Sequence, residues 1–409
     1  MIKRTILKQI EESVSSRPIT LITGARQVGK STLALLFEKK GFSYVSLDDY
    51  NEKNLAINDP KLFLSIHPCP LIIDEVQKAP QLFEAIEEVV NKEKKLNGYN
   101  YGMFILTGSQ IYKLMKGISE SLSGRVSIIH MSPLSRNEIL NREETAFNFN
   151  YMYINERAKQ NPLNHKNLFK LIIKGFYPEP HDNNNLKINK FYSDYVETYI
   201  ERDVSEIINI KNKLLFRQFM ELLGSLTGEE LVYDHIANII GVDKKTIISW
   251  ISVLLAGDII YLLQPYNENS ISKRIVKRPK LYFSDTGLAC YLSKLNDADV
   301  LQNSQFSGRF VETYIINEIR KSFLNNGLDA NFYYYRDNNM NEIDLIILRE
   351  GKLHRVECKS GITYNNSAVK GFKQLDETKY QIGEKVIICN TENVYAIKDN
   401  VIVLPLAGI

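Results

Sequence analysis

The chain of 409 residues has only four cysteines, one tryptophan and no long uninterrupted apolar run. The cysteines, at positions 69, 290, 358 and 389, lack metal-ligand spacing, so we expect free thiols in a reducing cytoplasm. The longest apolar stretch, residues 246–263, is interrupted by Gly257-Asp258, and a helix followed by a strand explains it better than a membrane span. Residues 1–4 lead into a charged helical pattern without an apolar signal region, so a cytoplasmic protein with no membrane segment is expected.

Neither sign of charge dominates, since 51 Lys and Arg residues face 48 Asp and Glu residues and leave a net charge of +3. This balance does not announce a nucleic-acid binder, so any basic surface must be local. Apolar residues make up 44% and charged residues 24% of the chain, which is typical of a globular protein. The length exceeds one ordinary core, and about two to four domains are expected.

The most informative segment is a glycine-rich loop near the N-terminus. An apolar run suited to a buried strand, residues 19–23, leads into G-x-x-x-x-G-K-S and then into an apolar helical pattern. This is the context of a phosphate-binding loop, whose backbone N–H groups cradle phosphates at a helix N-terminus. Lys30 is predicted to reach the β- and γ-phosphates, and the Ser31 hydroxyl to ligate Mg²⁺. The predicted nucleotide-binding residues are Gly24, Ala25, Arg26, Gln27, Val28, Gly29, Lys30, Ser31 and Thr32.

Two further apolar strands end in polar side chains. Residues 71–73 run into Asp74 and Glu75, where Asp74 suits a Mg²⁺ contact and Glu75 suits activation of the attacking water. Residues 103–106 run into Thr107, and this residue, Ser109 or Gln110 is predicted to lie beside the γ-phosphate. The alternative is that Thr107, Ser109 and Gln110 are ordinary turn residues.

A different pattern occupies residues 232–283. A short helix ending at Gly241 and a longer helix over 244–255 make a helix-turn-helix signature, and two strand-like runs follow, as in a winged helix. The candidates for base contacts are Lys244, Lys245, Thr246 and Ser249. The wing region carries five basic residues suited to phosphate contacts: Lys273, Arg274, Lys277, Arg278 and Lys280. A protein-interaction module with a solvated basic face is the alternative.

A third constellation lies near the C-terminus. Residues 341–348 and 354–359 are predicted to form two strands of a hairpin, which places Asp344 and Glu357 where they could hold one divalent cation, Mg²⁺ or Mn²⁺. Lys359 would stabilise developing charge beside them, and Glu312 on a preceding helix would add a third carboxylate. The alternative is a set of Glu and Lys pairs on an exposed hairpin face.

In this order, the motifs resemble a family of bacterial and archaeal proteins that join an AAA+-type ATPase domain to a C-terminal domain of unknown function, whose end resembles the PD-(D/E)xK nucleases. The matching segments are residues 24–31, 72–78, 106–109, 122–125, 133–135, 175–179, 201–203, 282–288, 308–312, 335–337 and 356–360. The fold expected is α/β. It comprises a P-loop parallel-sheet ATPase domain over 1–140, a helical lid over 141–205, a winged helix over 206–290 and a restriction-endonuclease-like domain over 291–409.

The resemblance implies Mg-ATP binding by the loop, Mg²⁺ and water roles for Asp74 and Glu75, and a sensor role near Ser109. It also implies that Arg125 is offered to a γ-phosphate, either in its own chain or from a neighbouring subunit of a homo-oligomer. The Pro that usually precedes the first nuclease Asp is Ile343 here. The Gln-x-x-x-Tyr helix of recombination-type nucleases is absent, so the resemblance supports the nuclease-like fold more than it supports cleavage.

Three functions follow from these patterns. The first is an ATPase that associates with DNA and cuts it with the C-terminal domain. The second is a nucleotide-gated switch that binds DNA or protein and has an inactive nuclease-like domain. The third, a small-molecule kinase, is weakened by the Asp74-Glu75 pair and by the extra domains. A GTPase is disfavoured because no Asn-Lys-x-Asp guanine motif occurs.

Overall fold

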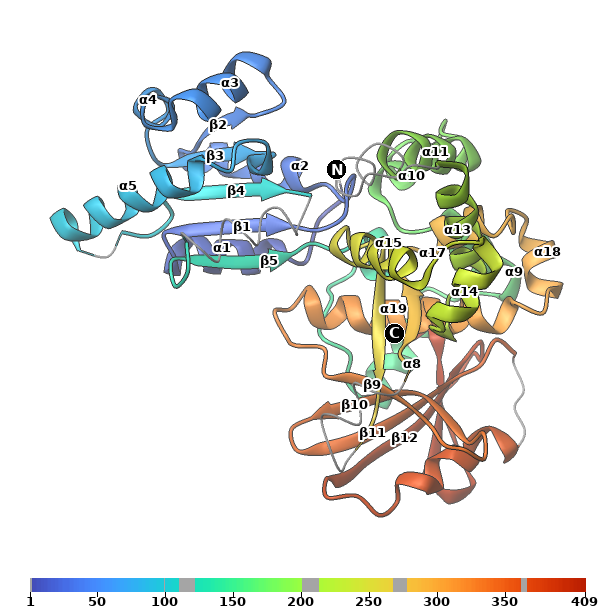
Figure 1. Ribbon diagram of the computed structural model, residues 1–409. Coiled ribbons are helices and arrows are strands. Elements are labelled where there is room, and N and C mark those ends of the chain that lie inside the picture. Colours follow the sequence, from blue (N-terminus) through green and yellow to red (C-terminus); the bar gives the residue numbers. More distant parts are fainter. Residues whose placement is uncertain (1, 99, 110–121, 201–212, 268–277, 362–365) are drawn as a thin grey trace.

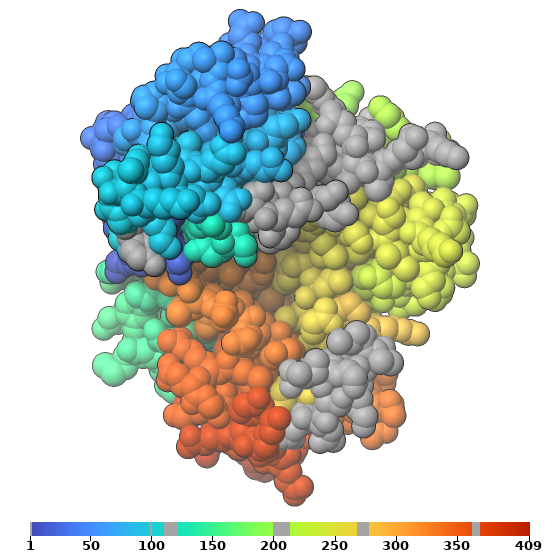
Figure 2. Space-filling model, turned by 60° about the vertical axis from the view of Figure 1, so that its left-hand side comes forward, coloured from blue at the N-terminus to red at the C-terminus, as the bar shows by residue number. Residues whose placement is uncertain are grey.

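The structure is a computed structural model that describes residues 2–98, 100–109, 122–200, 213–267, 278–361 and 366–409. Figure 1 shows one sheet with flanking helices at the N-terminal end, a helical middle, and a larger sheet that contains the C-terminal strands. The space-filling view in Figure 2 shows the N-terminal part at one end of the molecule and the C-terminal part at the other.

The first sheet has five parallel strands in the order β2-β3-β4-β1-β5. The strands are β1 (Ile19–Thr23), β2 (Ser43–Ser46), β3 (Leu71–Asp74), β4 (Phe104–Gly108) and β5 (Val126–His130). The predicted parallel α/β sheet with the phosphate loop after its first strand is therefore confirmed. Because β1 lies between β4 and β5, the loop leaves the carboxyl edge of the sheet at its centre.

Helices cover both faces of this sheet because alternate strand residues point to opposite sides. Ile22, Ile72 and Ile105 pack with α1 (Leu7–Ser16), α2 (Lys30–Ala34) and η1 (Leu35–Lys40). Leu21, Ile73 and Leu106 pack in a second cluster on the other face. The helices of that side are α3 (Tyr50–Asn58), α4 (Pro60–Ile66) and α5 (Leu82–Asn97), and η2 (Val76–Lys78) follows β3.

The next region is helical, and residues 141–200 contain no strand. Its helices are α7 (Arg136–Ile139), α8 (Tyr151–Gln160), α9 (His165–Lys174), α10 (Pro178–Asp182), α11 (Ile188–Tyr195) and η3 (Val196–Ile200). Residues 201–205, the end of the predicted lid, lie outside the described part of the chain.

The expected helices and strands of residues 232–283 are also present. After α13 (Lys213–Ser225), α14 (Tyr233–Ile240) ends at Gly241, which has φ 77°, and α15 (Lys244–Ala256) begins with Asp243 as its N-cap. The strands β7 (Ile260–Pro265) and β8 (Lys280–Phe283) pair antiparallel, and the short β6 (Glu229–Glu230) pairs with β8. Of the five basic wing residues, Lys273, Arg274 and Lys277 lie outside the described residues.

These strands do not form an isolated wing, because β7 also pairs in parallel with β9. The result is a nine-stranded sheet, β13-β14-β12-β11-β10-β9-β7-β8-β6, which runs across the boundary predicted at residue 290. Its other strands are β9 (Phe332–Arg336), β10 (Glu342–Arg349), β11 (Lys352–Cys358), β12 (Gln381–Cys389), β13 (Tyr395–Ile397) and β14 (Val401–Pro405). The flanking helices are α17 (Thr286–Leu292), α18 (Ala298–Asn303), α19 (Ser307–Leu324), η4 (Asn366–Leu375), η5 (Lys398–Asn400) and η6 (Leu406–Gly408).

The predicted C-terminal hairpin is confirmed. Strands β10 and β11 pair antiparallel with Leu345 opposite Val356 and Arg349 opposite Lys352. Glu350 and Gly351 form the turn with φ values of 53° and 76°. Continuing the register by one residue brings Asp344 opposite Glu357.

Candidate functional site

The phosphate loop has a backbone that its glycines make possible. Gly24 has φ 139° and Gly29 has φ 95°, values that side-chain-bearing residues rarely adopt. A Cβ atom on Gly24 would lie 2.2 Å from the carbonyl oxygen of Met131, so the loop closes tightly against the segment after β5. The loop therefore follows β1 and opens α2 in the geometry that the sequence predicts.

Lys30 lies at the centre of this loop and is almost completely buried. Its Nζ donates hydrogen bonds to the carbonyl oxygens of Gly24 and Ala25, at 3.0 and 2.7 Å. Burial lowers the pKa of Lys30 to about 8, and the nearby carboxylates of Glu75 and Asp74 oppose this shift. The ammonium group is thus positioned to bind phosphate oxygens, which would replace the two carbonyl acceptors.

The depressed pKa of Lys30 makes ATP affinity pH-dependent. Phosphates favour the ammonium form, so the dissociation constant of Mg-ATP is expected to rise above pH 8 by up to about tenfold per unit. Titrations between pH 7 and 9.5 would measure this slope. The guanidinium of Lys30→Arg does not titrate in this range, so this variant is expected to bind Mg-ATP more weakly and with an affinity that does not change with pH. A wild-type affinity that does not change with pH would contradict the role of Lys30 in phosphate binding.

Asp74 at the end of β3 is held by three hydroxyl groups. Ser31 donates to Oδ1 at 2.8 Å, Tyr44 donates to Oδ2 at 2.9 Å, and Thr107 also donates to Oδ1. Burial, together with the hydrogen bond to Asp74, raises the pKa of Tyr44 to about 12. The predicted pair Ser31 and Asp74 is therefore brought together, as Mg²⁺ binding requires, and sequence reasoning missed Tyr44.

Glu75 follows Asp74 in a left-handed conformation with φ 56° and ψ 42°. A residue other than glycine rarely adopts this conformation, which costs about 1–3 kcal/mol and is concentrated at functional sites. Its backbone N–H donates to Thr107 Oγ1 at 3.3 Å, and its carboxylate accepts from Gln77. Thr107 thus contacts both Asp74 and Glu75, and its predicted phosphate contact stays a prediction.

Ser109 lies just beyond β4 and is fully buried. Its hydroxyl has no hydrogen-bond partner among the residues that the structure describes. A buried hydroxyl without a partner at this edge of the sheet suits a phosphate sensor. Gln110, the third candidate, lies outside the described residues.

A cleft of about 730 Å³ surrounds the loop. Its walls come from the phosphate loop, from the N-terminal segment and from the helical region around α10. This volume is in the range of small-molecule and cofactor sites. The lining residues are Ile2, Lys3, Arg4, Leu7, Arg26, Gln27, Val28, Gly29, Lys30, Ser31, Thr32, Leu33, Leu36, Glu75, Met131, Leu134, Pro178, Glu179, Asp182 and Asn183.

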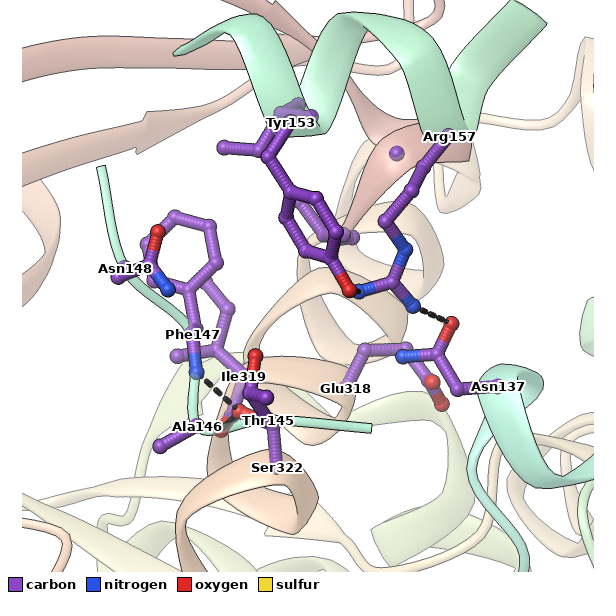
Figure 3. A pocket seen from close by; sticks show the side chains of 13 residues that line it. Asn137, Thr145, Ala146, Phe147, Asn148, Tyr153, Arg157, Glu318, Ile319 and Ser322 are labelled. Carbon is purple, nitrogen blue, oxygen red and sulfur yellow. Dashed lines mark hydrogen bonds between the residues drawn. The ribbon is translucent and has the colours of Figure 1, made fainter. Parts of the chain in front are cut away.

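A second cavity, shown in Figure 3, lies between α8, α19 and the residues near position 408. Its volume is about 20 Å³, which is space for about one water molecule. Arg157 donates to Asn137 beside it, and the Phe147 N–H donates to Ser322 Oγ at 2.9 Å. It is a packing gap at a junction and is too small for a nucleotide.

Buried hydrogen bonds connect the phosphate loop to the rest of the molecule. Arg4 donates to the carbonyl oxygens of Val28 and Ser132, both at 2.7 Å, and pairs with Glu138 on α7 at 3.1 Å. The same short helix reaches α19, because the Arg136 N–H donates to Glu318 Oε2 at 2.7 Å. A series of buried hydrogen bonds and ion pairs thus runs from the loop through α7 to α19.

Asp258 gives a second connection. It occupies the turn between α15 and β7, is buried, and has φ 54°. Burial raises the pKa of its carboxyl group, while the charges of Arg320, His130 and Lys30 act to lower it. The helix-turn-helix region therefore brings a carboxylate into the electrostatic range of the phosphate-loop lysine.

The structure corrects the expectation that Arg125 serves the nucleotide of its own chain. This residue precedes β5, whose Val126 is level with Ile19 at the start of β1, whereas the phosphate loop follows the other end of β1. Its guanidinium bonds to Asn91 Oδ1 at 3.0 Å and pairs with Glu87 at 3.1 Å. Arg125 thus lies at the opposite edge of the sheet from its own nucleotide site, and a role toward a neighbouring subunit stays a prediction.

The C-terminal candidates do come together, but not as a metal site. Among the described residues, no three His, Cys, Asp or Glu side chains are arranged to hold a metal ion. Lys280 lies among Glu312, Glu342 and Asp344, and Lys359 pairs with Glu357 at 2.5 Å. The predicted divalent-cation site at Glu312, Asp344 and Glu357, including its occupation by Mn²⁺, is therefore not supported.

The sequence also predicts that Lys280 contacts DNA in the wing, and the structure contradicts this because its side chain is only 4% exposed. Burial alone would lower the pKa of Lys280, but Glu312, Asp344 and Glu342 together raise it well above its ordinary value. Burial raises the pKa of Glu312 to about 7 despite the opposing effect of Lys280. Lys280 is thus a buried, charged partner of carboxylates and is not a surface base.

Residues 16–140 match the family model of the AAA domain. Residues 165–299 and 307–409 match two models described as domains of unknown function, DUF8612 and DUF4143. With the loop geometry and the parallel sheet, the first match identifies an AAA-type P-loop ATPase domain. Such a domain implies ATP as its ligand and usually Mg²⁺.

The chain is 24% identical over 405 residues to the uncharacterized protein Rv2008c of Mycobacterium tuberculosis, a match that covers 98% of this chain and 83% of that protein. It is 24% identical over 322 residues to the uncharacterized protein MJ1637 of Methanocaldococcus jannaschii, a match that covers 69% of this chain and 63% of that protein. Among solved structures, the Walker-type ATPase PABY2304 of Pyrococcus abyssi is 14% identical to this chain, with a TM-score of 0.42. The match covers 70% of this chain and 94% of that one. At these levels no activity is transferred from any of them.

None of the helices in the described part of the chain has the length and apolar character needed to cross a bilayer.

Proposed function

We propose that this protein is an ATP-driven switch, in which Mg-ATP binding and hydrolysis in the N-terminal cleft control a C-terminal module that binds DNA. The observation that carries the proposal is that Lys30, Ser31 and Glu75 line one cleft, where the Ser31 hydroxyl is hydrogen-bonded to Asp74. Lys30 neutralises the β- and γ-phosphates, Ser31 and Asp74 hold Mg²⁺, and Glu75 orients the attacking water. Ser109 senses the γ-phosphate from the end of β4.

The walls of the cleft support gating. Four residues of the helical region line the cleft together with the phosphate loop: Pro178, Glu179, Asp182 and Asn183. A nucleotide that contacts both walls binds the closed arrangement better than the open one, so it shifts the population toward closure. The hydrogen bonds from Arg4 to Val28 and from Arg136 to Glu318 supply a path to α19 and the large sheet.

The helix-turn-helix region supports DNA as the partner, and we assign it as a winged helix. Lys244 and Lys245 are exposed at the start of α15, and Arg278 is exposed before β8. Lys244 pairs with Asp234 at 2.8 Å, an exposed contact that phosphate can displace at little cost. These side chains suit backbone contacts, which add affinity without reading sequence.

The carboxylate cluster favours binding over cleavage for the C-terminal module. A metal-dependent nuclease needs carboxylate oxygens free to hold a divalent cation, and here Glu312 and Glu342 are paired with Lys280. A nucleotide-gated switch with an inactive nuclease-like domain is therefore favoured over an ATPase that cuts DNA.

The DNA assignment is tested by salt-dependent titration of a duplex with the full chain carrying Glu75→Gln, with and without ATP. Replacing Lys245 and Arg278 by Gln is expected to weaken binding and to reduce the log–log salt slope by roughly 0.9 for each phosphate that the variant no longer neutralises. Replacing the exposed Lys8 and Lys92 of the ATPase domain is the control and is expected to leave the slope unchanged. Equal affinity with and without ATP would contradict gating, and an unchanged slope in the Lys245 and Arg278 variant would contradict DNA contact.

A further inference from the structure

We propose that the ammonium group of Lys280 is the built-in cation of the C-terminal carboxylate cluster and takes the place that a divalent metal would occupy. The cluster then acts as an ionic latch between β8, α19 and β10. We define the carboxylate latch as Lys280, Glu312, Glu342 and Asp344. The latch requires neither ATP turnover nor DNA binding.

The distances place Lys280 inside the cluster. Its Nζ lies 2.9 Å from Glu312 Oε1, 2.5 Å from Glu342 Oε1 and 4.0 Å from Asp344 Oδ1. The side chains of Glu312 and Asp344 are 13% and 10% exposed, so water contributes little to their neutralisation. Carboxylates that are buried to this extent require a cationic partner, and Lys280 supplies it.

Two oxygens of the cluster also accept hydrogen bonds from other donors. Tyr282 donates to the same Oε1 of Glu312 at 2.6 Å, and the backbone N–H of Cys358 donates to Asp344 Oδ2 at 2.8 Å. Glu357 Oε2 has no hydrogen-bond partner among the described residues, but Oε1 of the same side chain is paired with Lys359. A Mg²⁺ or Mn²⁺ ion needs several oxygen ligands at once, and two ammonium groups here repel it.

The latch joins parts of the chain that are far apart in sequence. Lys280 begins β8, Glu312 lies in α19, and Glu342 and Asp344 lie in β10. It therefore fastens the strands that follow the helix-turn-helix to the C-terminal hairpin, in the same sheet that the pairing of β7 with β9 makes continuous. The two regions are expected to move as one body.

The test exchanges the built-in cation for a metal. In the full chain, Lys280→Met keeps a side chain of similar length but leaves buried carboxylates without a partner, so the melting temperature is expected to fall by about 5 °C or more. Because the ammonium is gone, Mn²⁺ is expected to bind this variant in calorimetry and to restore part of the melting temperature. Wild type is expected neither to bind Mn²⁺ nor to gain melting temperature from it, and samples with EDTA serve as the metal-free reference.

Lys385→Met is the matched control, since Lys385 pairs with Asp376 at 3.2 Å in the same sheet but away from the latch. It is expected to show no stabilisation by Mn²⁺. If Lys280→Met does not fold, Mn²⁺ calorimetry on wild type and Asp344→Asn decides the question. The proposal would be overturned if wild type bound Mn²⁺ and Asp344→Asn did not. It would also be overturned if Lys280→Met were as stable as Lys385→Met and its melting temperature did not change with Mn²⁺.

Discussion

Lys30→Ala is expected to weaken Mg-ATP binding by roughly 100-fold or more, because the phosphates lose a charged donor fixed in a buried loop. The side chain already projects onto the loop that would hold them, at 3.0 and 2.7 Å from two of its carbonyl oxygens. Calorimetry with Mg-ATP would measure the change in affinity. Lys8→Ala, an exposed lysine of α1, is the matched control and is expected to bind as wild type does.

Glu75→Gln is expected to separate binding from turnover. The amide keeps the shape of the side chain but cannot accept a proton from water, so kcat for ATP is expected to fall by about 10²–10⁴-fold while affinity is retained. Glu84→Gln, an exposed change on α5, is the control and is expected to leave kcat unchanged. Equal hydrolysis by wild type, Lys30→Ala and Glu75→Gln would remove the assignment of the cleft.

The parts of the site that the sequence could predict are those in which neighbouring residues suffice. The loop from Gly24 to Ser31 depends on a strand, glycines and a helix that are consecutive in the chain. The hairpin of β10 and β11 likewise depends on local alternation and on the turn at Glu350-Gly351. Local patterns of this kind determine local conformation because few other arrangements satisfy them.

The remaining contacts depend on strand order and on packing between distant segments. Tyr44 reaches Asp74 only because β2 lies beside β3, and no motif marks that tyrosine. The family resemblance implies a γ-phosphate contact for Arg125, yet the parallel sheet puts this residue at the opposite edge from the nucleotide site of its own chain. Composition alone could not reveal either outcome.

Lys280 illustrates the same point through burial. In sequence it is one of five clustered basic residues, a pattern typical of a solvated or phosphate-binding surface. In the fold, β8 lies between β7 and β6, and all four of its residues are buried. The carboxylates that neutralise Lys280 are 32 or more residues away, at Glu312, Glu342 and Asp344.

Asp285 is a buried carboxylate that ties the helical region to the segment after β8. It accepts hydrogen bonds from the Phe176 N–H at 2.6 Å, the Leu288 N–H at 2.7 Å and the Tyr192 hydroxyl at 2.8 Å. It is also the N-cap of α17. Burial raises its pKa even though all three donors act to lower it. Three donors from three segments therefore converge on one side chain that water does not reach.

Asp285→Ala is expected to lower the free energy of unfolding by about 3 kcal/mol or more, because it leaves buried donors without an acceptor and removes a helix cap. Asp285→Asn is expected to cost less, since the amide oxygen still caps α17 while its NH₂ group faces the Phe176 N–H. Asp297→Ala is the matched control, because Asp297 caps α18 at an exposed position and its removal should cost only about 1 kcal/mol.

The measurement can use the one tryptophan of the chain. Trp250 is buried against Phe216 and Phe219, and α13, which carries both phenylalanines, packs on α17. Urea titrations followed by its fluorescence would report the midpoint for this part of the molecule. An Asp285→Ala midpoint equal to that of Asp297→Ala would mean that the buried donors find other acceptors and that Asp285 is merely a helix cap.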